Sequence, residues 1–493
     1  MELEKQERSL EDHFSPASTP DLSTTKDLAD AKPSEAEVRR VVRKIDWVLL
    51  PLLSGCMFLQ TSDKTLLNSV SLLNFQEDVH LTSSTQLSWL YSLFWIGYLI
   101  GTFTHARMIQ LCPLGRYVSG AVVLWGGIAA FHAACHTYEA FLAVRFFLGF
   151  MEAALPSSFI LLTGRFYTRD EQFVRTSLWY SMYGVAGIVA GAATYSELVH
   201  PPSNLAMWQS LYLIYGIVTM AFGLLCLFVL PSSPDTTFFL KPKERKLAVY
   251  HIVENQSGIH NTTFQWYQVR EALLDVRLYL YFLAFASLCI VNGSLYTFGN
   301  LIIESFHYDK KQSALLSMTL GGGMVVCVWL GMLGFHLLKR RDVVVISSLL
   351  VSIVGAALMI GLPASNKAGR MTGYALVSFF MLPGPVLYSC QSTTVSGTTK
   401  RLVFNVGLQV GSSVGNLIGP HPYDHSFRVG EAVMMAFLCV CLLLMVLISL
   451  VHYRMNLQKE RKALDYAADR ATQLALDLSD LTDKERHTYR YPY

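Results

Sequence analysis

The middle of this chain is a series of apolar stretches, each close to the length that crosses a lipid bilayer. A membrane-spanning helix needs about 20 apolar residues, and this length divides the sequence into twelve candidate spans. They are Trp47–Leu73, Gln86–Ile109, Tyr117–His136, Phe141–Phe166, Ser177–Leu198, Trp208–Leu230, Tyr279–Ile303, Ser313–Leu338, Val343–Leu362, Thr372–Ser396, Val403–Ile418 and Val429–His452. Only 15% of the residues are charged, against about 25% in soluble domains. The pattern predicts an all-α membrane protein.

Polar segments divide the chain into five parts. Residues 231–277 form the longest hydrophilic interruption and separate an N-terminal six-helix bundle, 45–230, from a C-terminal one, 278–452. Residues 1–44 are predicted to be a disordered tail, because Ser, Thr, Pro and charged residues dominate its sequence. Residues 453–493 are expected to form a second polar tail that begins as a solvated helix.

The loops carry their positive charges unequally. With the N-terminus in the cytoplasm, the outer loops hold only Lys310, Lys311, Lys367, Arg370 and Arg428. Cytoplasmic loops are normally enriched in Lys and Arg, so we expect both termini and residues 231–277 to be cytoplasmic. Basic tails on one side require an even number of spans, which excludes a seven-span receptor. We expect a multi-pass protein of the plasma membrane.

Four ionisable residues lie inside the predicted spans: Asp63 and Lys64 in the first, Arg145 and Glu152 in the fourth. Such a group costs roughly 2.5–3.5 kcal/mol at the bilayer centre on insertion scales, so those that persist usually face a wet cavity or each other. Arg145, Gly149 and Glu152 follow the spacing i, i+4, i+7 and therefore share one helix face. These charges predict a path for an ion or a polar substrate.

Several segments, in order, are similar to those of one known family. They are Arg43–Pro51 with Asp63–Asn68, Pro113–Arg116, Arg145–Glu152, Leu230–Pro234 with Phe239 and Leu240, Asn292–Gly299, Gly415–Pro420, and Asp480–Asp483 with Arg490 and Tyr491. Together with the twelve spans, they resemble the fungal allantoate permease family, which belongs to the anion:cation symporters of the major facilitator superfamily. The resemblance runs from residue 38 to the C-terminus.

This resemblance implies a major facilitator fold and a proton-coupled importer of a small organic anion, a carboxylate such as allantoate, nicotinate or a related vitamin or nitrogen source. The proton gradient is then the energy source, no cofactor is expected, and the protein is expected to act as a monomer among membrane lipids. The chain departs from the family pattern in three places. The loop after the second span lacks the superfamily aspartate, Thr394–Lys400 reads Thr-Val-Ser-Gly-Thr-Thr-Lys, and His421 stands where glutamine is expected.

The first and fourth helices are neighbours in this superfamily, which brings the four charges together. Arg145 or Lys64 can then bind a substrate carboxylate, because a guanidinium fork binds both oxygens and an ammonium supplies a point charge. Glu152 or Asp63 can carry the proton. The structural alternative is an ion pair of Arg145 with Asp63 or Glu152 that only fixes helix packing.

Polar residues in the second half complete the candidate substrate site. Asn405, Gln409, Ser412 and Asn416 form a stripe along the eleventh span, either as a cavity wall or as interhelical hydrogen bonds. Asn292 precedes Gly293 in the seventh span, and Tyr388 and Gln391 follow Pro383-Gly384-Pro385 in the tenth. Broken helices at the membrane midplane often line substrate sites. The candidate substrate ligands of this half are therefore Asn292, Tyr388, Gln391, Gln409 and Asn416.

Other function classes find little support in the sequence. The basic residues lie in short loops and form no stripe for nucleic acid, and neither a nucleotide-binding loop nor paired metal ligands appear. We therefore expect no enzyme and no nucleic-acid partner. The alternatives that stay open are an exporter of a small metabolite with the same fold and, from a different class, a non-transporting membrane sensor or an intramembrane enzyme.

Overall fold

The computed structural model describes residues 34–81, 83–253, 264–424, 426–463 and 482–483. Residues 1–33 of the predicted disordered tail lie outside this set, as do residues 254–263 of the central loop and most of the C-terminal tail. Within the described residues every regular element is a helix, so the all-α prediction is confirmed.

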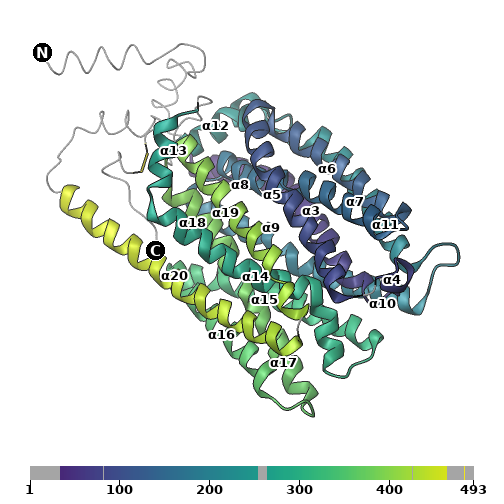
Figure 1. Cartoon of the computed structure of the whole chain (residues 1–493). Coiled ribbons are helices and arrows are strands. Elements are labelled where there is room, and N and C mark those ends of the chain that lie inside the picture. Colours follow the sequence, from purple (N-terminus) through teal and green to yellow (C-terminus); the bar gives the residue numbers. More distant parts are fainter. Residues whose placement is uncertain (1–33, 82, 254–263, 425, 464–481, 484–493) are drawn as a thin grey trace, which may run out of the picture.

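Twelve long helical units run between the two ends of the molecule (Figure 1). In chain order they are α3 (Glu35–Val70), α5 (Ser84–Leu111), α6 (Leu114–Phe131), α7–α8 (Tyr138–Glu152 and Ala154–Phe166), α9–α10 (Arg169–Tyr180 and Met182–Val199), α11 (Met207–Val229), α14 (Val276–Ser305), α15 (Lys310–Leu338), α16 (Arg341–Gly361), α17–η3–α18 (Lys367–Val377, Ser378–Met381 and Pro383–Thr394), α19 (Thr398–Ile418) and α20 (Phe427–Ala463). All but α3 and α9–α10 are long and apolar enough to cross a membrane by length and composition.

The units form an N-terminal half, α3 to α11, and a C-terminal half, α14 to α20, which lie side by side (Figure 1). Within the halves, α6 packs on α11, α5 on α7, and α14 on α19 and α20. Between the halves, α10 packs on α15 and α5 on α19. Glycines permit the close contact of α10 with α15. A Cβ on Gly184 of α10 would lie 2.4 Å from the carbonyl oxygen of Gly321 of α15.

Short helices mark the two ends of the molecule. Between the halves, α12 (Pro242–Val253) and α13 (Trp266–Leu273) lie within the predicted central loop, and we call their side of the molecule the α12–α13 end. The opposite side, the α4 end, carries α4 (Phe75–Asp78). Helix α3 starts at the α12–α13 end, where Lys44 forms an ion pair with Glu244 of α12.

The prediction of a disordered tail is wrong for residues 35–44, which form the first turns of α3. The side chain of Ser34 caps this helix by accepting a hydrogen bond from the amide of Ala36, and Glu35 and Glu37 lie in its first turn. Acidic residues there complement the partial positive charge of a helix N-terminus. The apolar spacing begins later, at Trp47, which is why the polar start of the helix resembled a tail.

The C-terminal tail is not wholly solvated, because Thr482 and Asp483 are buried. The Asp483 carboxylate lies 2.7 Å from Arg277 of α14 and 2.7 Å from Lys400 of α19. Its backbone oxygen accepts a hydrogen bond from Lys459 of α20. One residue of the tail therefore joins three helices of the C-terminal half at the α12–α13 end.

Replacing this aspartate should destabilise the C-terminal half. In Asp483→Asn the buried Arg277 and Lys400 lose a compensating charge, and breaking such a pair costs about 3–5 kcal/mol. Thermal unfolding of the purified protein in detergent measures the loss, with Glu139→Gln, an exposed acid at the start of α7, as control. Equal melting temperatures for Asp483→Asn and the unchanged protein would contradict a structural role for this contact.

Candidate functional site

A closed cavity lies between the two halves, and we call it the central cavity. It is lined by α3, α5, α8, α9 and α10 from one half and by α14, η3, α18 and α19 from the other. Its volume is about 30 Å³, which is room for water and not for an organic anion. Of the predicted site residues, the lining includes Lys64, Asn292, Tyr388, Gln409 and Asn416.

Lys64 is the charged residue in this lining, within the part of the chain that the structure describes. Its ammonium lies 3.2 Å from Oε2 of Glu152, and the two side chains are 7% and 0% exposed. The rings of Phe94, Trp95 and Tyr98 from α5 stand 5.5–5.8 Å from the same ammonium. Aromatic faces attract cations. The Lys64 ammonium is therefore held by the Glu152 carboxylate and by the aromatic rings of α5.

Glu152 sits where its helix is interrupted. Pro156 lacks the amide hydrogen that would bond the carbonyl of residue 152 in a continuous α-helix, and α7 ends at Glu152 while α8 begins at Ala154. The side-chain amide of Gln60 donates to that carbonyl at 3.3 Å. The proline therefore ties the fourth unit to α3 one turn before Lys64, and this contact helps to bring the Glu152 side chain to the ammonium.

Asp63 faces away from the cavity although it precedes Lys64 directly. Neighbouring residues of an α-helix point about 100° apart, and the carboxylate of Asp63 accepts a hydrogen bond from Trp125 of α6 at 2.7 Å. It remains within electrostatic reach of Arg145, Lys64 and Glu152. The two cations and two carboxylates form one buried cluster, which we call the charge cluster, and their formal charges cancel.

Arg145 does not line the central cavity. Its guanidinium donates a hydrogen bond to the hydroxyl of Tyr212 from α11 and lies 5.5 Å from the centre of that ring. The ring of His132 stacks on the ring of Tyr212, with centroids 4.8 Å apart. The ion pair of the charge cluster joins Lys64 to Glu152, and not Arg145 to Asp63 or Glu152 as the structural alternative from the sequence proposed.

Neutral polar groups from the C-terminal half face the charged residues across the cavity. Asn292 donates to Asn416 at 2.9 Å, and Gln409 donates to the hydroxyl of Tyr388 at 3.2 Å. Tyrosines of α5 reach over from the other half, because Tyr91 donates to Asn416 at 3.2 Å and Tyr98 to Gln409 at 3.0 Å. Gln409, Ser412 and Asn416 of the predicted polar stripe on α19 thus line the cavity, and Gln409 and Asn416 also join the halves, whereas Asn405 lies outside the lining.

Gln391 lies elsewhere. Its side-chain amide donates to the carbonyl of Arg401 at 3.0 Å, a contact between the end of α18 and the start of α19. The structure therefore places this predicted substrate ligand near the α12–α13 end, outside the lining of the central cavity.

Apart from Tyr388, the aromatic residues of the lining were not among the site residues predicted from the sequence. We call them the aromatic wall: Tyr91, Trp95, Tyr98, Tyr180, Tyr183, Phe285, Tyr296, Phe380 and Tyr388. A signal was present on the second span, where Tyr91, Trp95 and Tyr98 follow the spacing i, i+4, i+7 and so share a face. Aromatic residues are common in apolar spans, so that spacing alone did not separate a cavity wall from ordinary packing.

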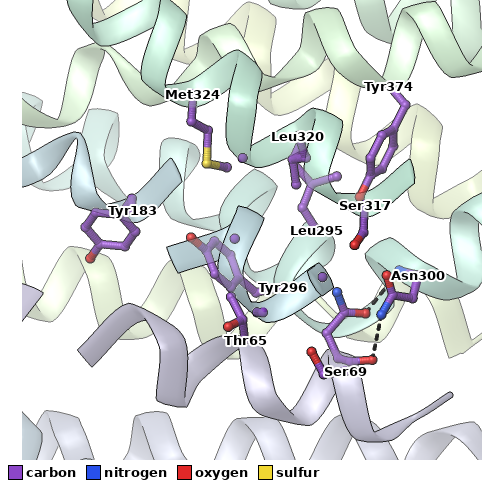
Figure 2. Close-up of a pocket in the computed structure, with 15 residues that line it drawn as sticks. Thr65, Ser69, Tyr183, Leu295, Tyr296, Asn300, Ser317, Leu320, Met324 and Tyr374 are labelled. Carbon is purple, nitrogen blue, oxygen red and sulfur yellow. Dashed lines mark hydrogen bonds between the residues drawn. The ribbon is translucent and has the colours of Figure 1, made fainter. Parts of the chain in front are cut away.

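A second cavity, of about 40 Å³, lies nearer the α4 end (Figure 2). Tyr183 and Tyr296 line both cavities and stand between them. Its polar lining includes Asn68 of α3 and Asn300 of α14. The backbone amide and the side-chain amide of Asn300 donate to the side-chain and backbone oxygens of Asn68, each at 3.0 Å, and these bonds join the halves (Figure 2).

The halves also meet on the other side of the central cavity. Toward the α12–α13 end, Phe173 of α9 packs on Phe335 of α15, with ring centres 4.7 Å apart. Tyr180 lies against Gly384 of α18. Contacts between the halves therefore lie on both sides of the central cavity.

Comparison with known proteins gives a consistent result. The sequence profile of the Major Facilitator Superfamily matches residues 53–420. An uncharacterised transporter of Schizosaccharomyces pombe is 29% identical over 461 residues, covering 92% of this chain and 87% of the relative. The allantoate permease of Saccharomyces cerevisiae is 28% identical over 481 residues, covering 92% and 86%.

Solved structures show the same fold. The xylose transporter XylE from Escherichia coli, in a partially occluded inward-open conformation, superposes with a TM-score of 0.62. The two sequences are 12% identical, and the match covers 82% of this chain and 97% of that one. The predicted fold of twelve helices in two bundles is thereby confirmed.

The position of Arg145 predicts a structural effect. Tyr212→Phe leaves a buried charged donor without its hydroxyl partner, which costs about 1–3 kcal/mol. We expect a lower melting temperature in detergent and an unchanged apparent KM for transport, because neither residue lines the central cavity. A raised KM with an unchanged melting temperature would show that Arg145 acts on the substrate.

Proposed function

The chain belongs to the major facilitator superfamily, and we propose that it imports a small organic anion together with a proton. It is a multi-pass membrane transporter; the anion and the proton are the parts that we propose. The substrate class is a carboxylate, such as allantoate, nicotinate or a related vitamin or nitrogen source. The observation that carries the proposal is the buried ion pair of Lys64 and Glu152 at the wall of the central cavity.

Charge balance explains how one proton and one anion would move together. The charge cluster is formally neutral, so a proton on Glu152 leaves it with a net positive charge inside the membrane. A buried uncompensated charge is strongly unfavourable. A substrate carboxylate that binds Lys64 in place of Glu152 restores neutrality, and the loaded cavity is again suited to the occluded state.

The ion pair also explains why the empty carrier would return without a proton. When Glu152 is ionised it pairs with the Lys64 ammonium, and the neutral cavity can then close. Binding of an anion alone would place two carboxylates at one ammonium. Proton and substrate therefore depend on each other, which is the coupling that a symporter needs.

The other candidate residues take separate roles in this proposal. Asp63 is the competing proton carrier, although Trp125 holds its carboxylate away from the cavity. Asn292, Gln409 and Asn416 supply neutral hydrogen-bonding groups from the C-terminal half, which can orient the part of the substrate distant from Lys64. Alternating access then requires the two halves to rock about the site.

We further propose that the protein is a monomer of the plasma membrane with both termini in the cytoplasm. Helix α3 begins and α20 ends at the α12–α13 end, as an even number of spans requires. Of the described Lys and Arg residues outside the predicted spans, those at the α4 end are Lys310, Lys311, Lys367, Arg370 and Arg428. This asymmetry favours a cytoplasmic location for the α12–α13 end.

Transport assays in a transport-deficient yeast test the coupling. With a panel of labelled carboxylates, we expect uptake to rise as external pH falls and to collapse with a protonophore. In proteoliposomes, one proton and one monoanion make an electroneutral step, so uptake should not respond to an imposed membrane potential. If proton entry instead drives the exit of preloaded substrate, and no uptake is seen, the protein is an exporter.

Substitutions of the ion pair test the residues. Lys64→Gln should lower uptake about 100-fold, because truncating one partner of a buried charge pair costs about 2–5 kcal/mol. Glu152→Gln resembles the protonated form and should lose accumulation against a gradient while it keeps pH-independent exchange. Glu431→Gln is the matched control, since Glu431 pairs with Arg370 at 3.3 Å and lies outside the cavity lining. Normal pH dependence in Glu152→Gln, with loss of it in Asp63→Asn, would assign the proton to Asp63.

Topology is tested separately. Epitope tags at the two termini should both resist protease in intact cells and both be digested after permeabilisation. Digestion of a single terminus in intact cells would contradict an even number of spans.

A further inference from the structure

We propose that the central cavity selects a monocarboxylate that carries a single flat aromatic ring. This inference rests on the proposed function and narrows its substrate class. Three features of the cavity carry it: its one cation, its aromatic wall, and the spacing between Lys64 and the amides of α19.

The charge of the lining sets the charge of the ligand. Within the described part of the chain, Lys64 is the charged residue in the cavity lining. The Glu152 carboxylate, which lies outside the lining, neutralises its charge. A proton on Glu152 releases one positive charge for one carboxylate. A second carboxylate on the same ligand would be buried against tyrosine, phenylalanine and amide groups without a cation, which is strongly unfavourable.

The aromatic wall sets the shape of the ligand. In the closed cavity its rings contact each other, with centroid distances of 5.0 Å between Trp95 and Tyr98 and 4.8 Å between Tyr180 and Tyr183. One contact crosses between the halves, where Tyr180 and Tyr388 have centroids 6.2 Å apart. Such pairs are worth more than their buried area alone, because ring edges and faces attract each other.

A ligand must separate these rings, because the closed cavity has a volume of only about 30 Å³. Separation breaks ring contacts, including the one between the halves. A flat aromatic ligand re-forms contacts of the same kind with the rings on either side. A saturated ring of the same size fills the space but offers no aromatic face or edge, so it recovers less of what was lost.

The spacing of the polar groups limits the ligand to one ring. The ring of Tyr98 lies 5.5 Å from the ammonium of Lys64, and the hydroxyl of the same side chain donates to Gln409 at 3.0 Å. The distance from the ammonium to the amide on α19 therefore cannot exceed the reach of one tyrosine ring with its two contacts. A single ring with a carboxylate at Lys64 and a polar substituent at Gln409 fits within this limit.

Matched ligands test the inference on the purified full-length protein. Benzoate and cyclohexanecarboxylate share size and charge and differ in aromaticity, while terephthalate adds a second carboxylate to the same ring. Binding is measured as quenching of tryptophan fluorescence and as competition with labelled benzoate for uptake in proteoliposomes. We expect benzoate to bind about 10-fold more tightly than cyclohexanecarboxylate and about 100-fold more tightly than terephthalate. A 4-hydroxyl on benzoate should strengthen binding.

Two variants of Tyr388 distinguish the effect of its ring from that of its hydroxyl. Tyr388→Leu should reduce the preference for benzoate over cyclohexanecarboxylate to about twofold, because the ring is lost. Tyr388→Phe keeps the ring and should keep the preference. Tyr215→Leu is the control, since this largely buried tyrosine of α11 lies outside the cavity lining.

The outcomes separate this inference from the proposed function. If cyclohexanecarboxylate or terephthalate binds as tightly as benzoate, the inferred selectivity for an aromatic monocarboxylate is wrong. The proposal of anion transport would not be affected. An aromatic preference that survives in Tyr388→Leu and is lost in Tyr215→Leu would also overturn the inferred selectivity. Absence of binding for every carboxylate, in a protein that melts cooperatively, would overturn the proposed function itself.

Discussion

The mutual neutralisation of four buried charges is the constraint on which the rest of the N-terminal half depends. Two cations and two carboxylates can remain in a low-dielectric interior only if their charges cancel at short range. That requirement fixes α3 against the fourth unit through Lys64 and Glu152, which lie 3.2 Å apart. It also draws in α6 and α11, whose Trp125 and Tyr212 bind the remaining two groups. In the proposed transport cycle, a single added proton would leave this cluster with a net positive charge.

Local backbone chemistry places this cluster. A proline three residues into α8 removes one backbone hydrogen bond, and the carbonyl that it frees is bound by Gln60 from the neighbouring helix. A comparable break occurs in the C-terminal half, where Pro383 follows the short helix η3. The carbonyl of Phe379, four residues earlier, lies 3.4 Å from the sulfur of Cys327. Membrane helices tolerate such breaks where a neighbouring helix satisfies the freed group, so each break also fixes a contact between helices.

The sequence predicted the helices and the burial of the charged residues better than it predicted which of these residues pair. Span length and charge placement were enough to identify the helices, the four buried charges and most of the polar groups of the second half. Spacing on one helix could not predict that Lys64, and not Arg145, would contact Glu152, because the choice depends on how α3 and the fourth unit are rotated against each other. Spacing also could not predict that Gln391 lies outside the lining of the central cavity, because its side chain at the end of α18 points toward the backbone of α19. The buried Asp483 depends on three distant helices and left no local signal beyond a short acidic motif.

The contacts within each half differ in kind from the contacts between the halves. This difference suits a carrier whose halves rock against each other. Ion pairs brace each half internally, as Arg175 with Asp46 does in the first and Arg277 with Asp483 in the second. Between the halves the structure shows hydrogen bonds, glycine contacts and aromatic contacts, such as Tyr98 with Gln409 and Tyr180 with Tyr388. Neutral contacts of this kind are individually weak, and a substrate in the cavity can replace several of them. The charge cluster therefore lies within one half, while the contacts between the halves lie beside the central cavity, where a ligand could replace them.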